Sequence, residues 1–130
     1  MRPNRSRLIL CTGQIHAALR KHRETQSIRD TVFTIVEELH PFPFEEIQRD
    51  LENYPNLKMI VWTQEEPYNG GVWHHVRDRT ETVLRRSETH STCHLLYAGR
   101  PQSAAVAVDV KSPHEAQLNK LVEDALLVSE

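Results

Sequence analysis

Several residue types that define whole classes of protein are scarce in this chain of 130 residues. Its two cysteines, Cys11 and Cys93, are too few for the disulfide framework of a small secreted protein, so they fit a reducing compartment. No apolar run approaches the roughly 20 residues that a membrane-spanning helix requires. The net charge of -2 gives no global attraction to nucleic acid or to acidic membranes. We therefore expect no nucleic-acid partner and no membrane partner.

Glycine is also scarce, with only four residues in the chain. One of them, Gly13, follows an apolar run, but a single glycine falls well short of a dinucleotide-binding fingerprint. What remains is an ordinary globular composition, with 38% apolar and 26% charged residues. This length and composition suit a single domain with one core over residues 1–130.

The N-terminal segment is rich in arginine, and its first acidic residue is Glu24. Such a composition is typical of a cleavable mitochondrial leader. However, Leu8, Ile9 and Leu10 form an apolar run that is typical of a buried strand. We therefore expect this segment to fold as part of the domain.

Short apolar runs alternate with helical patterns along the chain. The strand-like runs cover residues 7–11, 31–36, 58–63 and 94–98, and 104–108 is either a further strand or part of a loop. The helical patterns cover residues 14–22, 44–51, 72–84 and 113–126. Ser112 can cap the last helix, in which Glu115 completes a capping box. This alternation predicts an α/β three-layer sandwich, in which a mostly parallel sheet lies between two layers of helices.

In sheets of this kind, ligands bind outside the carboxyl ends of the strands. Three segments of note should lie there: Thr12-Gly13, residues 63–71 and residues 99–103. We therefore expect them to share one edge of the sheet.

Five segments resemble the C-terminal domain of the 2-oxoglutarate dehydrogenase first component, the thiamine-diphosphate-dependent decarboxylating subunit. They occur in the family's order: CTGQIHAAL (11–19), ELHPFPFEEI (38–47), YPNLKMIVWTQEEPYNGGVW (54–73), ETVL (81–84) and YAGRPQSA (97–104). The resemblance covers about residues 7–126, and IVWTQEEPYNGGVW (60–73) is its most specific part. The segment HLLYAGR (94–100) looks like the fungal branch. The resemblance implies a transketolase C-terminal-domain-like, Rossmann-like fold.

The chain departs from the family pattern at two places. Thr63 stands where the family usually has cysteine, and Val108-Asp109 stands where it usually has a Thr-Gly pair. The second change removes a glycine from the loop before the last helix. That loop is therefore a doubtful place for a ligand contact.

The resemblance also implies what this chain does not do. The full-length family enzyme decarboxylates 2-oxoglutarate oxidatively and passes a succinyl group to the lipoyl arm of a partner. Its thiamine diphosphate and magnesium lie in earlier domains, beside a GDG motif that this chain lacks. We therefore expect an assembly or regulatory domain with no catalytic residues, no bound cofactor and no activity alone. The implied location is the mitochondrial matrix, or the cytoplasm for a stand-alone chain without a leader.

The segment after the third apolar run is a candidate interface loop. In the family it helps to form the contact surface between subunits and domains, and the matching residues are Gln64, Glu65, Glu66, Asn69, Gly71 and Trp73. Glu65 and Glu66 are neighbours in an extended segment, so their side chains point in opposite directions. They therefore make a poor acid–base pair.

Two places are candidates for an anion or a regulatory ligand. Thr12 and Gly13 lie where a helix begins, and a helix N-terminus offers unpaired N–H groups. Arg100, with Ser103 and Lys111, can grip a phosphate. Related bacterial subunits respond to nucleotides and acetyl-CoA, so the resemblance implies these ligands. The alternatives are an ordinary helix start and an ion pair made by Arg100.

The eight histidines predict no metal site. His90, Cys93 and His94 have irregular spacing, and His74 and His75 are adjacent on a helix, where neighbours face different ways.

Cys11, beside His16, is either a reactive thiol at a helix start or a small core residue, which is the commoner case.

Three functions remain open at this point. The chain is the C-terminal domain of a 2-oxoglutarate dehydrogenase-like subunit, a stand-alone module that senses nucleotides or acetyl-CoA, or an interaction protein that docks on the full-length enzyme. An orphaned subunit domain should expose apolar surface and self-associate, whereas a free module should stay monomeric. The sequence does not separate 2-oxoglutarate from 2-oxoadipate as the substrate of the parent enzyme.

Overall fold

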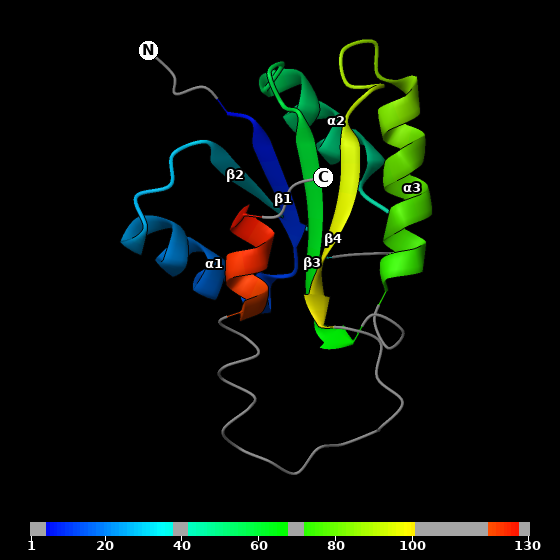
Figure 1. Cartoon of the computed structure of the whole chain (residues 1–130). Helices are drawn as coiled ribbons and strands as arrows, with labels where there is room; N and C mark the ends of the chain where they lie inside the picture. The colour runs from blue at the N-terminus through cyan, green and yellow to red at the C-terminus, as the bar shows by residue number, and fades with distance from the viewer. Residues whose placement is uncertain (1–4, 38–41, 68–71, 101–119, 128–130) are drawn as a thin grey trace.

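The computed structural model describes residues 5–37, 42–67, 72–100 and 120–127 (Figure 1). Strands and helices alternate along the chain, as predicted. Their order is β1 (Arg7–Cys11), α1 (Gly13–Thr25), β2 (Thr31–Ile35), α2 (Phe44–Asn53), β3 (Met59–Pro67), α3 (Trp73–Arg86) and β4 (His94–Arg100), followed by a helix over residues 120–127.

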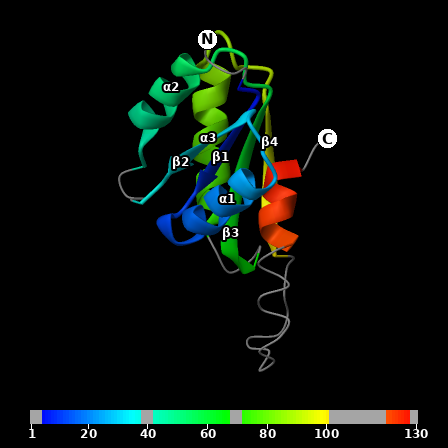
Figure 2. The same ribbon diagram turned by 90° about the vertical axis from the view of Figure 1, so that its left-hand side faces the viewer.

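The four described strands form one parallel sheet in the order β2-β1-β3-β4. Helices α2 and α3 cover one face, while α1 and the helix over residues 120–127 cover the other (Figures 1 and 2). The predicted three-layer α/β architecture is thus confirmed. Among the described helices, none is long and apolar enough to cross a membrane.

The first half of strand β3 shows why residues 59–62 are all apolar. Ile60 and Trp62 pack in the cluster under α2 and α3, whereas Val61 packs in the cluster under α1 and the last helix. All three side chains are fully buried. Successive residues of a strand point to opposite faces, so a strand between two helical layers must be apolar at every position.

The limits of the first strand are as predicted, but those of other elements differ. Helix α1 runs to Thr25 and α3 to Arg86, beyond the last apolar residue of each pattern. Strand β3 does not end at Thr63 but continues to Pro67, because it pairs with β4 through Gln64 opposite Gly99 and Pro67 opposite Arg100. Residues 104–108 and the start of the last helix, including Ser112, lie outside the described residues.

Candidate functional site at the carboxyl edge of the sheet

The strand register brings the three predicted segments to one edge. Cys11 at the end of β1 pairs with Thr63 of β3, and Thr63 pairs with Ala98 of β4. Thr12, Gln64 and Gly99 follow directly after these three residues. The expectation of a shared carboxyl edge therefore holds for the described parts of the three segments, while residues 68–71 and 101–103 lie outside the described residues.

Helix α1 begins at this edge. Thr12 precedes its first residue, Gly13, and the Thr12 carbonyl accepts the His16 backbone N–H at 3.2 Å. The Thr12 side chain makes no capping hydrogen bond. The first N–H groups of a helix have no partner within it, and they carry the positive end of its dipole. The start of α1 therefore remains a candidate anion site.

Arg100, the last residue of β4, lies at the same edge through its pairing with Pro67. Ser103 and Lys111 lie outside the described residues, as do Asn69 and Gly71 of the candidate interface loop. The backbones of Glu65 and Glu66 belong to β3.

Gln64 and Trp73 of the candidate interface loop are both buried. Gln64 is 1% exposed, and its Oε1 accepts the Trp62 Nε1–H at 2.9 Å in the core. Trp73 is 5% exposed and its ring lies 5.3 Å from that of Tyr97. The hydrogen bond between Trp62 and Gln64 was not predicted from the sequence. Its only signal is a glutamine two residues after a tryptophan, on the same face of a strand.

Gly99 lies opposite Gln64 at a place too tight for a side chain. A Cβ atom there would lie 3.1 Å from the Gln64 carbonyl oxygen and 2.7 Å from Cζ of Tyr97. A larger residue would have to displace the Tyr97 ring, which contacts Trp73. Glycine at position 99 thus leaves room for the Tyr97 ring beside β3.

Thr63 carries an unpaired polar atom in this region. Its side chain is fully buried, and its Oγ1 has no hydrogen-bond partner among the residues that the structure describes. An unpaired buried hydroxyl is costly, so Thr63→Val should raise the free energy of unfolding by about 1 kcal/mol. The measurement is urea denaturation of both forms. Cysteine, which the family usually has at this position, avoids the same cost.

Thr31 offers a matched control for this prediction. It is also fully buried, but its Oγ1 donates to Asp30 Oδ1 at 3.0 Å. Thr31→Val should therefore lower the free energy of unfolding by about 1 kcal/mol. Equal effects of the two substitutions would contradict the assignment of Thr63 Oγ1 as unpaired.

Cys11 is a core residue. Burial raises the pKa of its thiol to about 12, so the thiol stays protonated at neutral pH. The neighbouring His16 ring packs edge-on against Phe33 at 5.4 Å. Burial, together with the nearby Arg20 and Arg23, lowers the pKa of His16. A reactive cysteine requires an environment that lowers the pKa of its thiol, whereas burial raises the pKa of Cys11.

His90 and Cys93 are engaged in holding a turn. His90 Nε2 lies 3.0 Å from the Tyr54 carbonyl and its Nδ1 lies 3.2 Å from Ser87 Oγ, while Cys93 Sγ donates to the Leu57 carbonyl at 3.1 Å. Within the ranges that the structure describes, no group of three histidine, cysteine or acidic side chains could hold a metal ion.

Comparison with known proteins places the chain. Residues 2–126 match the family model described as 2-oxoglutarate dehydrogenase C-terminal. The chain belongs to this family. It is 42% identical over 118 residues to the mitochondrial 2-oxoglutarate dehydrogenase of Saccharomyces cerevisiae, a match that covers 91% of this chain and 12% of that protein. It is 38% identical over 120 residues to the 2-oxoglutarate dehydrogenase E1 component of Haemophilus influenzae, covering 92% and 12%.

The predicted resemblance to the C-terminal domain of the 2-oxoglutarate dehydrogenase first component is thus confirmed. A probable 2-oxoadipate dehydrogenase E1 homolog of Dictyostelium discoideum is also similar, at 32% identity over 119 residues, with 92% of this chain and 13% of that protein covered. The chain therefore spans about an eighth of the length of these relatives, and it corresponds to their C-terminal region.

Proposed function

We propose that this chain acts as the C-terminal assembly domain of a 2-oxoglutarate dehydrogenase-type decarboxylating subunit and is not catalytic alone. The observation that carries the proposal is that the described polar side chains at the carboxyl edge of the sheet are buried rather than exposed to a substrate. The described polar groups there serve the core: Gln64 bonds Trp62, Thr63 is buried, and the Cys11 thiol stays protonated. Among the described side chains at this edge, none is poised as a nucleophile or a general base.

The cofactor that the family implies does not fit the described residues. A diphosphate with magnesium requires a cluster of oxygen ligands and a backbone cradle. The described ranges hold no cluster of three candidate ligands, and the chain has no GDG motif. We propose that thiamine diphosphate and magnesium bind the rest of the parent subunit, whose reaction is the oxidative decarboxylation of 2-oxoglutarate. Three relatives are named as mitochondrial, which supports a location in the mitochondrial matrix.

The test of this function combines the chain with a partner. The partner is the Saccharomyces cerevisiae relative truncated just before the region that matches this chain. We expect no decarboxylation by the chain alone with 2-oxoglutarate, thiamine diphosphate and magnesium. We also expect the chain to co-elute with the truncated relative and to raise its melting temperature, because a ligand of the folded state stabilises it by mass action. Activity of the chain alone, or failure to bind, would overturn the proposal.

A regulatory ligand is the second candidate function, and the start of α1 favours it. The unpaired N–H groups after Thr12 fit a phosphate of a nucleotide or of acetyl-CoA. The measurement is a thermal-shift titration with AMP and with acetyl-CoA. The comparison is a Gly13→Pro variant, in which one donor is lost at a position where proline is tolerated. A shift of equal size in both forms would place the ligand elsewhere.

A further inference from the structure

A hollow lies between the end of β2 and the start of α2. Strand β2 is the outermost described strand on its side of the sheet, and its exposure rises from 0% at Thr31 to 40% at Ile35. The hollow has a volume of about 540 Å³. It is lined by Thr34, Ile35 and Glu37 at the end of β2, and by residues 42–46 at the start of α2. It therefore lies at an outer edge of the described sheet.

Half of the eight residues that line the hollow are apolar. They are Ile35, Phe42, Pro43 and Phe44. Phe44 is 41% exposed, although its ring packs edge-on against that of Phe42 at 4.9 Å. Three large apolar residues are exposed in the described part of the chain, and Ile35 and Phe44 are two of them. A partner that enters this hollow can therefore cover both together.

The hollow is also acidic, since Glu37, Glu45 and Glu46 line it. All three side chains are exposed, and none has an ion-pair or hydrogen-bond partner among the described residues. The one arginine of α2, Arg49, forms no ion pair with Glu45 one turn away. The helix dipole favours the two acids in the first turn of α2, but it amounts to only about half a unit charge. Most of the negative charge therefore remains uncompensated.

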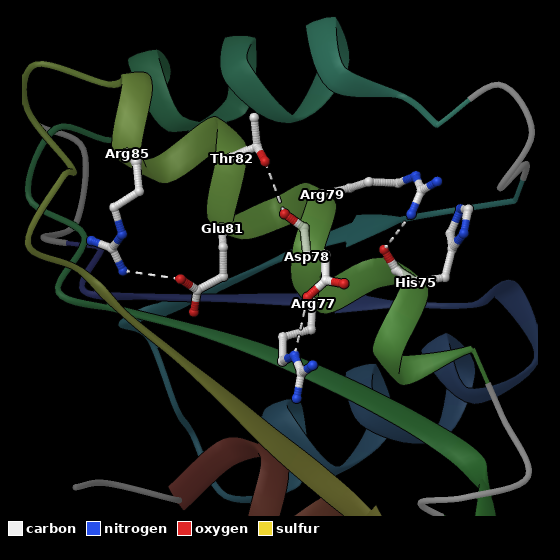
Figure 3. A network of polar contacts seen from close by, with 7 residues as sticks. All are labelled: His75, Arg77, Asp78, Arg79, Glu81, Thr82 and Arg85. Carbon is white, nitrogen blue, oxygen red and sulfur yellow. Dashed lines mark hydrogen bonds and ion pairs between the residues drawn. The ribbon is translucent and has the colours of Figure 1, made fainter.

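The neighbouring helix α3 does not supply the missing cations. Three of its four arginines are engaged within α3 itself, as Figure 3 shows. The contacts are Arg77 with Asp78 at 3.4 Å, Arg85 with Glu81 at 3.3 Å, and Arg79 with the His75 carbonyl at 3.2 Å. The fourth arginine, Arg86, is the last residue of α3. The hollow lies near the other end of this helix, where the Phe42 ring is 6.1 Å from that of His75.

We propose that this hollow docks a positively charged segment of a separate protein, in which arginine or lysine alternates with apolar side chains. An extended segment directs successive side chains to opposite sides, so it can offer cations to the carboxylates and apolar groups to Phe44. Arginine suits the site best, because its guanidinium group grips a carboxylate with two hydrogen bonds. The volume is in the range of ligand sites, so the hollow takes a short segment rather than a folded surface.

The composition of the hollow favours a partner that binds reversibly. Three of its eight lining residues are carboxylates, whereas permanent interfaces are more apolar. The inference therefore goes beyond the proposed assembly role, since the partner is neither the parent subunit nor a second copy of the chain.

The first experiment measures binding of a defined peptide. The probe is a labelled, capped peptide of alternating arginine and leucine, and its fluorescence anisotropy is followed at low salt as the chain is added. We expect saturable binding that weakens about tenfold between about 0.02 M and 0.5 M salt, because salt screens exposed charges. The same peptide with glutamate in place of arginine should not bind. Amide chemical shifts of the isotope-labelled chain should change most at residues 34–37 and 42–46.

Two variants separate the contributions of charge and of apolar contact. Glu37→Gln/Glu45→Gln/Glu46→Gln removes the three charges and keeps the shape of the side chains, so it should weaken peptide binding about tenfold. Phe44→Ala removes the exposed ring and should weaken binding about fivefold. Because all four side chains are exposed, we expect both variants to stay folded, which far-ultraviolet circular dichroism measures.

A matched control tests for a general effect of charge. Glu24→Gln/Glu123→Gln/Asp124→Asn also removes three exposed carboxylates, but on the layer formed by α1 and the last helix. It should leave the affinity for the peptide within about twofold of the natural value. Equal losses in both triple variants would overturn the proposal.

Other outcomes would also overturn it. They are the absence of binding at about 1 mM peptide and chemical-shift changes centred on another surface. Displacement of the peptide by the truncated Saccharomyces cerevisiae relative would assign the hollow to the parent subunit instead. Dissociation of a dimer when the peptide binds would assign it to a second copy of the chain. None of these peptide results decides the assembly role, because that role is tested by binding of the truncated relative itself.

Discussion

Replacing Trp62 with phenylalanine should lower the free energy of unfolding by about 3 kcal/mol. The Trp62 ring is fully buried, and its Nε1–H is donated to Gln64 Oε1 in the core. Phenylalanine removes this donor from a buried acceptor, a change that costs about 1–3 kcal/mol. The smaller ring also leaves a cavity that the surrounding side chains fill only partly. Urea denaturation followed by far-ultraviolet circular dichroism measures the loss.

A double-mutant cycle isolates the hydrogen bond from the cavity. Gln64→Leu alone leaves the Trp62 donor unpaired, and the combined variant removes both polar partners. We expect the combined loss to be at least 1 kcal/mol smaller than the sum of the single losses, since neither partner is then left unpaired. Additive losses would show that the two side chains do not depend on each other.

Arg7→Met should lower the free energy of unfolding by about 2 kcal/mol. Arg7 begins β1 and is 9% exposed, and its Nη1 donates to the Ala125 carbonyl at 3.1 Å, across 118 positions of the sequence. Methionine retains the apolar stem but removes the hydrogen bond to this carbonyl. Hydrogen exchange should show faster opening of the helix over residues 120–127.

Arg5 provides the comparison for this prediction. It also donates to a backbone carbonyl, that of Arg29, but the contact is exposed. Arg5→Met should therefore change the free energy of unfolding by less than about 0.5 kcal/mol. If both methionine variants lose the same amount, the bond to Ala125 is not what stabilises the chain.

The elements that the sequence predicts well are those whose pattern is local. Residues 7–11 are nearly all apolar, and their limits agree with β1. By contrast, β3 continues past Thr63 through a polar stretch, because pairing with β4 stabilises residues that have no strand pattern of their own. The end of α1 is similarly polar, so apolar periodicity stops at His22 while the helix continues to Thr25.

In the candidate site too, features that follow from a local pattern could be predicted, and features that depend on distant contacts could not. The shared edge of the sheet follows from strand alternation alone, so it could be predicted. The burial of Gln64 could not, because a polar side chain enters the core only when a distant or neighbouring partner satisfies it. The charges of α2 and α3 are visible in the sequence, but only the strand order places the two helices beside each other.

The strand order also bears on how the chain folds. Strand β1 comes first in the sequence yet lies inside the sheet, with β2 on one side and β3 on the other. Its outer face is then covered by residues of the last helix, including Leu121 and Leu126. Within this domain, burial of β1 is therefore complete only once residues about 110 positions later in the sequence have been synthesised. Long-range closure of this kind slows folding, and it leaves the apolar β1 exposed on the ribosome until the helix over residues 120–127 emerges.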